Sequence, residues 1–148
     1  MARILGKSTL KQPSSSMKIY IGHSTSFDFQ NELYKIIRES DISQQHEIIF
    51  PHEKSDEQFS SKTLFQSGCD LMIAEVSWPS TGLGIELGWA DTHHVPVVCI
   101  YRKGSKVSGA LKVVSQNFFE YENPSDILRV ISKYLTERTI ARQKPRVR

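Results

Sequence analysis

The sequence has 148 residues, of which 39% are hydrophobic and 24% are charged, and its formal net charge is +3. A chain of this length is sufficient for one globular domain with an ordinary core. It has no apolar run near the ~18 residues of a membrane span and no apolar signal-peptide segment, so we expect neither a membrane protein nor a secreted one. Cys69 and Cys99 lie in or beside apolar runs, which is more typical of buried free thiols than of a disulfide or a metal site. We therefore expect a cytoplasmic protein.

The positive charge is concentrated at the two ends of the chain. Nine of the 19 basic residues lie within residues 1–18 and 138–148, which leaves ten basic and 16 acidic residues elsewhere. A nucleic-acid-binding protein is expected to carry its basic residues on a folded face together with aromatic side chains. The observed distribution indicates solvated tails instead, so we expect no nucleic-acid partner.

Between these ends, strand-like and helix-like patterns alternate along the chain. We expect strands over 17–22, 46–50, 70–76, 95–101 and 117–121, and helices over 27–40, 56–68, 84–94, 105–114 and 124–138. Residues 1–16 and 139–148 are polar or charged, and we expect them to be a flexible N-terminal tail and a basic C-terminal tail. The single α/β domain then comprises residues 17–138.

This alternation predicts parallel strands joined by right-handed crossovers, and hence a three-layer α/β domain. For five strands, the flavodoxin-like or Rossmann-like order 2-1-3-4-5 is the commonest solution. Ligands bind such sheets beyond the carboxyl ends of the strands, where the strand order reverses. The sequence therefore predicts a binding site between strands 1 and 3, formed by the loops over 22–28 and 77–84.

The second of these loops opens a glycine-rich segment, SWPSTGLGIELGWA, over residues 77–90. Gly82 and Gly84 can adopt positive φ and can let a ligand approach the backbone closely. The free N–H groups of the following helix would suit a phosphate or another anion. The spacing G-x-G-x-x-x-G after the third strand matches neither a dinucleotide-binding fingerprint nor a P-loop.

Glu86 is the one carboxylate in this segment. We expect it in the first turn of the helix, where the helix dipole lowers its pKa and keeps it ionised. A permanently ionised carboxylate at a ligand-binding mouth suits a nucleophile better than a general acid. An ordinary first-turn glutamate is the alternative that the pattern leaves open.

Residues 69–90, CDLMIAEVSWPSTGLGIELGWA, resemble the nucleoside 2-deoxyribosyltransferase superfamily, including its 2′-deoxynucleoside 5′-phosphate N-hydrolase branch. The shared pattern is Asp-(apolar)-Ala-x-Val, a loop, and then G-x-G-x-E-L-G-x-A, and the order of elements agrees over residues 17–121. The resemblance implies that Glu86 attacks the anomeric carbon of the sugar and that Tyr20 contacts its carboxylate. Such an attack forms a glycosyl ester, as in retaining glycosidases. For Tyr20, a half-buried strand tyrosine is the alternative.

Ser80 distinguishes the two branches of this superfamily. Transferases acting on free nucleosides tend to carry an acidic residue at this place, whereas the nucleotide hydrolases carry serine, which avoids like-charge repulsion of a 5′-phosphate.

His52 follows the second strand and is either a contact to the base or a surface histidine. The full set of predicted substrate-binding residues is Gly22, His23, Ser24, Thr25, His52, Lys62, Ser80, Gly82, Gly84 and Ser108.

Three positions depart from the superfamily pattern. The aspartate expected eight residues before Asp70 is replaced by Lys62, which either contacts a phosphate or is a solvated helix lysine. The arginine of the hydrolase first loop falls at about Thr25. The phosphate-contacting serine from a neighbouring subunit falls near Gly109, next to Ser108.

From these observations we predict hydrolysis of the N-glycosidic bond of a (deoxy)nucleoside 5′-monophosphate through a glutamate nucleophile. Two alternatives stay open: a nucleoside 2-deoxyribosyltransferase that exchanges bases, and a non-catalytic nucleotide-binding protein on the same fold. We expect no cofactor and no metal, and the resemblance implies a homodimer or a larger homo-oligomer with shared sites. The site requires Glu86 to lie within about 10 Å of Tyr20, because both groups must surround one anomeric carbon.

Overall fold

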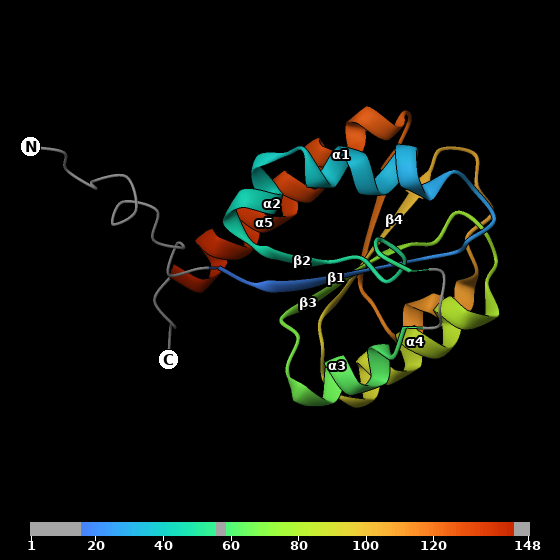
Figure 1. Cartoon of the computed structure of the whole chain (residues 1–148), viewed down its shortest axis with the longest axis horizontal. Coiled ribbons are helices and arrows are strands. Elements are labelled where there is room, and N and C mark those ends of the chain that lie inside the picture. The colour runs from blue at the N-terminus through green and yellow to red at the C-terminus, as the bar shows by residue number, and fades with distance from the viewer. Residues whose placement is uncertain (1–15, 56–58, 144–148) are drawn as a thin grey trace, which may run out of the picture.

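The computed structural model describes residues 16–55 and 59–143, which form an α/β domain around one sheet (Figure 1). In this part of the chain the sheet has five parallel strands in the order β2-β1-β3-β4-β5, which confirms the predicted topology. The strands are β1 (Lys18–His23), β2 (Glu47–Ile49), β3 (Leu71–Glu75), β4 (Val97–Arg102) and β5 (Asn117–Tyr121).

Helices cover both faces of the sheet (Figure 1). One face carries the π-helical turn η1 (Gln30–Tyr34), α1 (Lys35–Arg38), α2 (Asp41–Gln45) and α5 (Ile127–Gln143). The other face carries α3 (Ser61–Ser67) and α4 (Thr81–Thr92). Two 3₁₀ turns, η2 (Gly109–Val113) and η3 (Pro124–Asp126), flank β5 in the chain. No helix in the described ranges is long and apolar enough to cross a membrane.

Each face of the sheet packs on its own apolar cluster. Along β1, Ile19 and Ile21 face the cluster under α1 and α5, while Tyr20 between them faces the cluster under α3 and α4. All five residues of β3 are buried, because this central strand is covered on both sides. This explains why its sequence is nearly continuously apolar rather than alternating.

Several element ends differ from those predicted. The helix expected over 27–40 ends at Arg38, close to its predicted end, and Ser40 after it has an extended backbone and a hydroxyl that donates to the Ile37 carbonyl at 2.6 Å. A new helix, α2, begins directly after it. Helix α3 begins at Ser61 rather than at 56, and residues 56–58 lie outside the described part. Helix α5 continues to Gln143, five residues past its predicted end, because no glycine or proline interrupts residues 127–143.

A buried polar network fixes the loop that leads from β3 into α4. Glu75 is fully buried and accepts hydrogen bonds from the Tyr121 hydroxyl and, at 2.5 Å, from the Ser77 backbone N–H. The Ser77 hydroxyl in turn accepts from the Arg102 backbone N–H at 2.7 Å. Burial raises the pKa of Glu75. The carboxyl ends of β3, β4 and β5 are thereby joined, and the start of α4 is held in place.

Candidate active site

A tyrosine–carboxylate pair joins β1 to α4, the helix that follows β3. The hydroxyl of Tyr20 on β1 donates a hydrogen bond to the carboxylate of Glu86 on α4. Tyr20 is completely buried, and Glu86 is half-buried. The two residues are 66 positions apart in the chain, and the parallel pairing of β1 with β3 brings them together. The predicted proximity of these residues is confirmed.

Aromatic packing holds the Tyr20 ring. Phe59 stacks on it with ring centroids 5.8 Å apart, and Phe65 of α3 meets it edge-on at 5.4 Å. Burial and the negative charge of Glu86 raise the pKa of the Tyr20 phenol far above its ordinary value. Tyr20 therefore stays protonated and acts as a fixed hydrogen-bond donor.

Glu86 is not in the first turn of its helix, contrary to the sequence prediction. Helix α4 begins at Thr81 because the Ser80 hydroxyl caps it, accepting from the Leu83 backbone N–H at 3.2 Å. Glu86 consequently lies in the second turn, beyond the main influence of the helix dipole. Burial raises the pKa of Glu86, and the hydrogen bond from Tyr20 opposes this effect. A carboxylate on a strong donor is still suited to nucleophilic attack once it is ionised.

Gly82 and Gly84 do not use the positive φ that glycine permits. Both residues are in the first turn of α4 with ordinary helical backbone, since α4 starts earlier than predicted. A Cβ atom at either position would meet no atom within 4 Å. Their lack of side chains leaves the start of α4 open to a ligand, which is a different contribution from conformational freedom.

Gly22, at the end of β1, has a clear packing role. A Cβ at this position would lie 2.5 Å from Met72 Cε and 3.0 Å from Leu83 Cδ1. Leu83 belongs to the first turn of α4, so the absence of a side chain at Gly22 lets α4 pack closely on β1. This close approach brings Glu86 within hydrogen-bonding distance of Tyr20.

We expect Gly22→Ala to lower the free energy of unfolding by about 1–3 kcal/mol, because Met72 and Leu83 must move to accept the methyl group. Gly82→Ala is the matched control, because its new methyl group meets no neighbour and alanine favours a helix. The control is expected to be neutral or stabilising. Urea denaturation of both variants measures the difference, and equal stabilities would contradict the packing role of Gly22.

The loop after β1 is held by internal hydrogen bonds. His23 and Ser24 are buried. The His23 Nδ1–H donates to the Ser24 carbonyl at 2.7 Å, and His23 Nε2 accepts from the Tyr34 hydroxyl at 2.5 Å. The Ser24 hydroxyl contacts that of Ser26 at 2.7 Å. Of the predicted binding residues in this loop, Thr25 is exposed, whereas His23 and Ser24 shape the loop from within.

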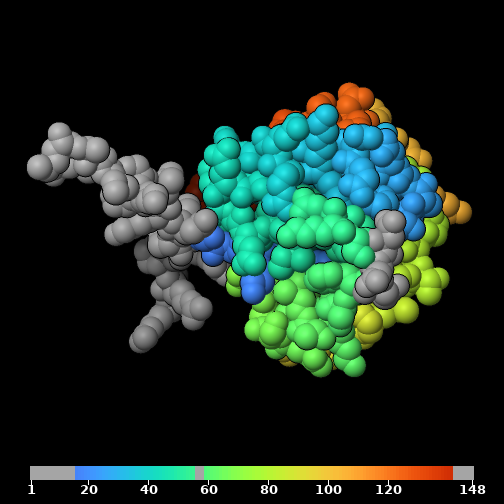
Figure 2. Space-filling view, in the orientation of Figure 1, coloured from blue at the N-terminus to red at the C-terminus, as the bar shows by residue number. Residues whose placement is uncertain are grey.

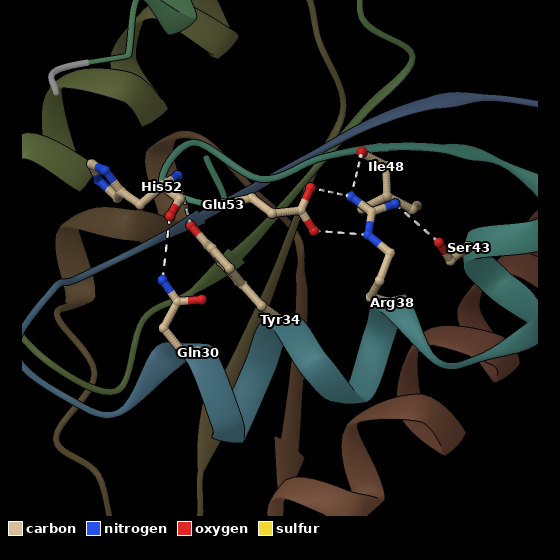
Figure 3. Close-up of polar contacts among 7 residues, drawn as sticks. All are labelled: Gln30, Tyr34, Arg38, Ser43, Ile48, His52 and Glu53. Carbon is tan, nitrogen blue, oxygen red and sulfur yellow. Dashed lines mark hydrogen bonds and ion pairs between the residues drawn. The ribbon is translucent and has the colours of Figure 1, made fainter. Parts of the chain in front are cut away.

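His52 is positioned through its backbone (Figure 3). Its N–H donates to the Tyr34 hydroxyl at 3.1 Å, and its carbonyl accepts from Gln30 Nε2 at 3.2 Å. The next residue, Glu53, forms a two-point ion pair with Arg38 at 2.7 and 2.8 Å. The imidazole projects away from this ion pair (Figure 3). Figure 2 shows the segment that follows β2 between the helices of one layer and α3 of the other.

Lys62 and Ser61 are arranged differently from the sequence prediction. Lys62 is exposed, and its ammonium lies 6.0 Å from the centroid of the Trp89 ring. Ser61, one position earlier, is completely buried. The buried face of α3 therefore carries Ser61 rather than Lys62, which is the residue eight positions before Asp70. The sequence analysis did not select Ser61, because a serine at a helix start carries no distinctive signal.

Ser80 and Ser108 both line a cavity of about 640 Å³ beside the start of α4. Lys106 contributes a cation to it, and its remaining wall is largely apolar. Each serine also caps a helical turn, since the Ser108 hydroxyl accepts from the Ala110 N–H at 3.3 Å. Neither Tyr20 nor Glu86 lines this cavity.

The fold and the site define a flavodoxin-like α/β domain with a tyrosine–carboxylate pair at the switch point of its sheet. Sequence comparison finds relatives named "Putative 2'-deoxynucleoside 5'-phosphate N-hydrolase 1". The relative from Syntrophotalea carbinolica is 32% identical over 74 residues, which are 46% of this chain and 50% of the relative. The relative from Nematostella vectensis is 38% identical over 79 residues, which are 49% of this chain and 52% of the relative.

These matches confirm the resemblance to the N-hydrolase branch of the nucleoside 2-deoxyribosyltransferase superfamily. A third relative of the same name, from Methanosarcina barkeri, is 29% identical over 69 residues, which are 45% of this chain and 43% of the relative. The chain thus spans about half the length of the curated relatives it matches. No family model matches the chain.

A solved structure supports the fold independently. The crystal structure of a conserved protein from Enterococcus faecalis aligns with a TM-score of 0.57, covering 81% of this chain and 99% of the other. Its sequence identity of 14% makes this a likeness of fold alone.

Proposed function

We propose that this protein hydrolyses the N-glycosidic bond of a (deoxy)nucleoside 5′-monophosphate, with Glu86 as the nucleophile. The observation that carries the proposal is the hydrogen bond from the buried Tyr20 hydroxyl to the Glu86 carboxylate. This pair lies where an open parallel sheet binds its ligands. The names of the relatives support both the hydrolytic reaction and the phosphorylated substrate.

The proposed reaction has two steps. One carboxylate oxygen of Glu86 forms a bond to C1′ while the C1′–N bond breaks. The electron pair of the C1′–N bond leaves with the base, and the base takes a proton from solvent. Water then adds to C1′, loses a proton, and displaces Glu86 as a carboxylate. Tyr20 binds one oxygen of Glu86 and leaves the other for the attack. The net reaction consumes one water and yields free base and sugar phosphate.

The start of α4 is the proposed place of the 5′-phosphate. A helix N-terminus favours an anion, and the open positions at Gly82 and Gly84 let a ligand approach its N–H groups. Ser80 contributes a hydroxyl without a negative charge, and Lys106 contributes a cation on the cavity side. These features favour a nucleoside monophosphate over an uncharged nucleoside.

A product assay tests the function. The protein is incubated with a panel of deoxynucleoside monophosphates, ribonucleoside monophosphates and nucleosides, and free base is measured by chromatography. We expect base release from monophosphates in buffer alone. Release only when an acceptor base is added would identify a transferase, and binding without release would identify a non-catalytic nucleotide-binding protein.

Ser80→Asp is expected to weaken monophosphate binding by roughly 1–3 kcal/mol and to spare the free nucleoside, because it places a like charge beside the phosphate. Aspartate and asparagine both cap helices as well as serine does, so neither substitution removes the start of α4. Ser80→Asn is therefore the matched uncharged control, and we expect it to spare both ligands. Isothermal titration with a monophosphate and its nucleoside measures the effect. An equal response of the two ligands to Ser80→Asp would contradict the phosphate assignment.

A further inference from the structure

Ser61 has a buried hydroxyl with no hydrogen-bond partner. The residue has no exposed surface, and its Oγ finds no partner among residues 16–55 and 59–143. A buried hydroxyl without a partner is unfavourable, and native proteins seldom keep one outside a functional site. The position of Ser61 therefore calls for an explanation other than stability.

The local structure directs Ser61 toward the tyrosine–carboxylate pair. Ser61 is the first residue of α3, and its backbone N–H donates to the Phe59 carbonyl at 3.1 Å. Phe65 lies one turn further along the helix, on the same face as Ser61. Both Phe59 and Phe65 pack on the Tyr20 ring, one against its face and one against its edge. The two aromatic contacts thus bring the Ser61 side chain to the side of α3 that faces Tyr20.

The electrostatic surroundings agree with this geometry. Burial raises the pKa of both Tyr20 and Glu86, and the Ser61 hydroxyl opposes this rise at each group, although it forms no hydrogen bond with either of them in the structure. A hydroxyl can rotate about its Cα–Cβ bond to reach a nearby acceptor. The Tyr20–Glu86 pair can therefore supply the hydrogen-bond acceptor that the Ser61 hydroxyl lacks.

We propose that Ser61 is a positioning residue whose hydroxyl donates into the Tyr20–Glu86 pair and so holds Glu86 ionised with one oxygen free for the substrate. Ser61 is then the second hydrogen-bond donor to Glu86, and Tyr20 is the first. The catalytic consequence rests on the proposed function, whereas the effect on the ionisation of Glu86 does not depend on it.

The titration of Glu86 tests the role of Ser61 directly. The carboxyl ¹³C signal of Glu86, assigned by its loss in Glu86→Gln, is followed against pH in the full chain. We expect Ser61→Ala to raise the midpoint by about one pH unit, a tenfold change in the protonation equilibrium, because the ionised form loses a donor. The other titratable groups facing Glu86, namely Tyr20, His52 and Tyr34, are kept in the variant. Ser60→Ala is the matched control, because Ser60 is the exposed neighbour, and it should leave the midpoint unchanged.

Thermal unfolding separates positioning from a structural role. If Ser61 is a positioning residue, Ser61→Ala lowers the melting temperature only at pH values above the Glu86 midpoint, where the ionised carboxylate loses a donor, and leaves it unchanged below the midpoint. A lower melting temperature together with an unmoved Glu86 midpoint would overturn the proposal, and so would loss of the fold. In the hydrolase assay, the acidic limb of kcat/KM should move up with the midpoint. No base release from the unsubstituted protein would instead overturn the proposed function and leave the carboxyl titration to decide the role of Ser61.

Discussion

Glu86→Gln is expected to lower the rate of base release by a factor on the order of 10³ or more. The substitution keeps the shape of the side chain and an acceptor for the Tyr20 hydroxyl, but it removes the anion that attacks the anomeric carbon. Ligand binding should change little, since the proposed phosphate contacts lie at the start of α4. Single-turnover kinetics and equilibrium binding with the same monophosphate measure the two effects separately.

Asp91→Asn is the matched control for this substitution. Asp91 is an exposed acidic residue of the same helix, and the change likewise replaces a carboxylate by an amide. We expect its turnover to equal that of the unsubstituted protein. Full turnover by Glu86→Gln would show that another group is the nucleophile. Equal losses in both variants would point to a general effect of charge on α4 rather than to a reaction at Glu86.

His23 is expected to make folding stability depend strongly on pH. Burial lowers the pKa of His23 from 6.5 to about 4 in the folded protein. Between these values the unfolded chain binds more protons than the folded one, so stability decreases as the pH falls from 6.5 toward 4 and then levels off. The full effect is on the order of 3 kcal/mol. Urea denaturation at a series of pH values measures it.

His23→Gln isolates this contribution. A glutamine side chain accepts from the Tyr34 hydroxyl as Nε2 does, but it does not titrate. Burial raises the pKa of Glu75 and of Glu86, and both groups therefore favour the folded state as the pH falls, which is opposite in sign to His23. The difference between the two pH profiles cancels these carboxylates. A difference that stays constant from pH 7 to 4 would contradict a buried neutral His23.

The order of the sheet and the meeting of Tyr20 with Glu86 were predictable from the sequence. The alternation of strands and helices allows few topologies, and the commonest one puts the ends of β1 and β3 side by side. Tyr20 lies two residues before the end of the first apolar run, and Glu86 follows the third run. Topology brings the two segments together, whereas the choice of Tyr20 as the partner of Glu86 comes from the family resemblance.

The environment of these residues was less predictable. Ser80 begins α4 three residues earlier than the pattern indicated, and this shift places Glu86 in the second turn, where burial rather than the dipole determines its pKa. A shift of one residue at the start of α3 exchanges the exposed Lys62 for the buried Ser61. Helix starts depend on a few local hydrogen bonds, which periodicity does not resolve.

The stereochemistry of base release tests the central claim most directly. A deoxynucleoside monophosphate, whose base is in the β configuration, is incubated with the protein in buffer containing methanol, and the sugar products are identified by NMR. A Glu86 nucleophile requires two displacements at C1′, so the account predicts free base together with the β-methyl glycoside 5-phosphate. The α-methyl glycoside, or no base release from any monophosphate, would contradict it.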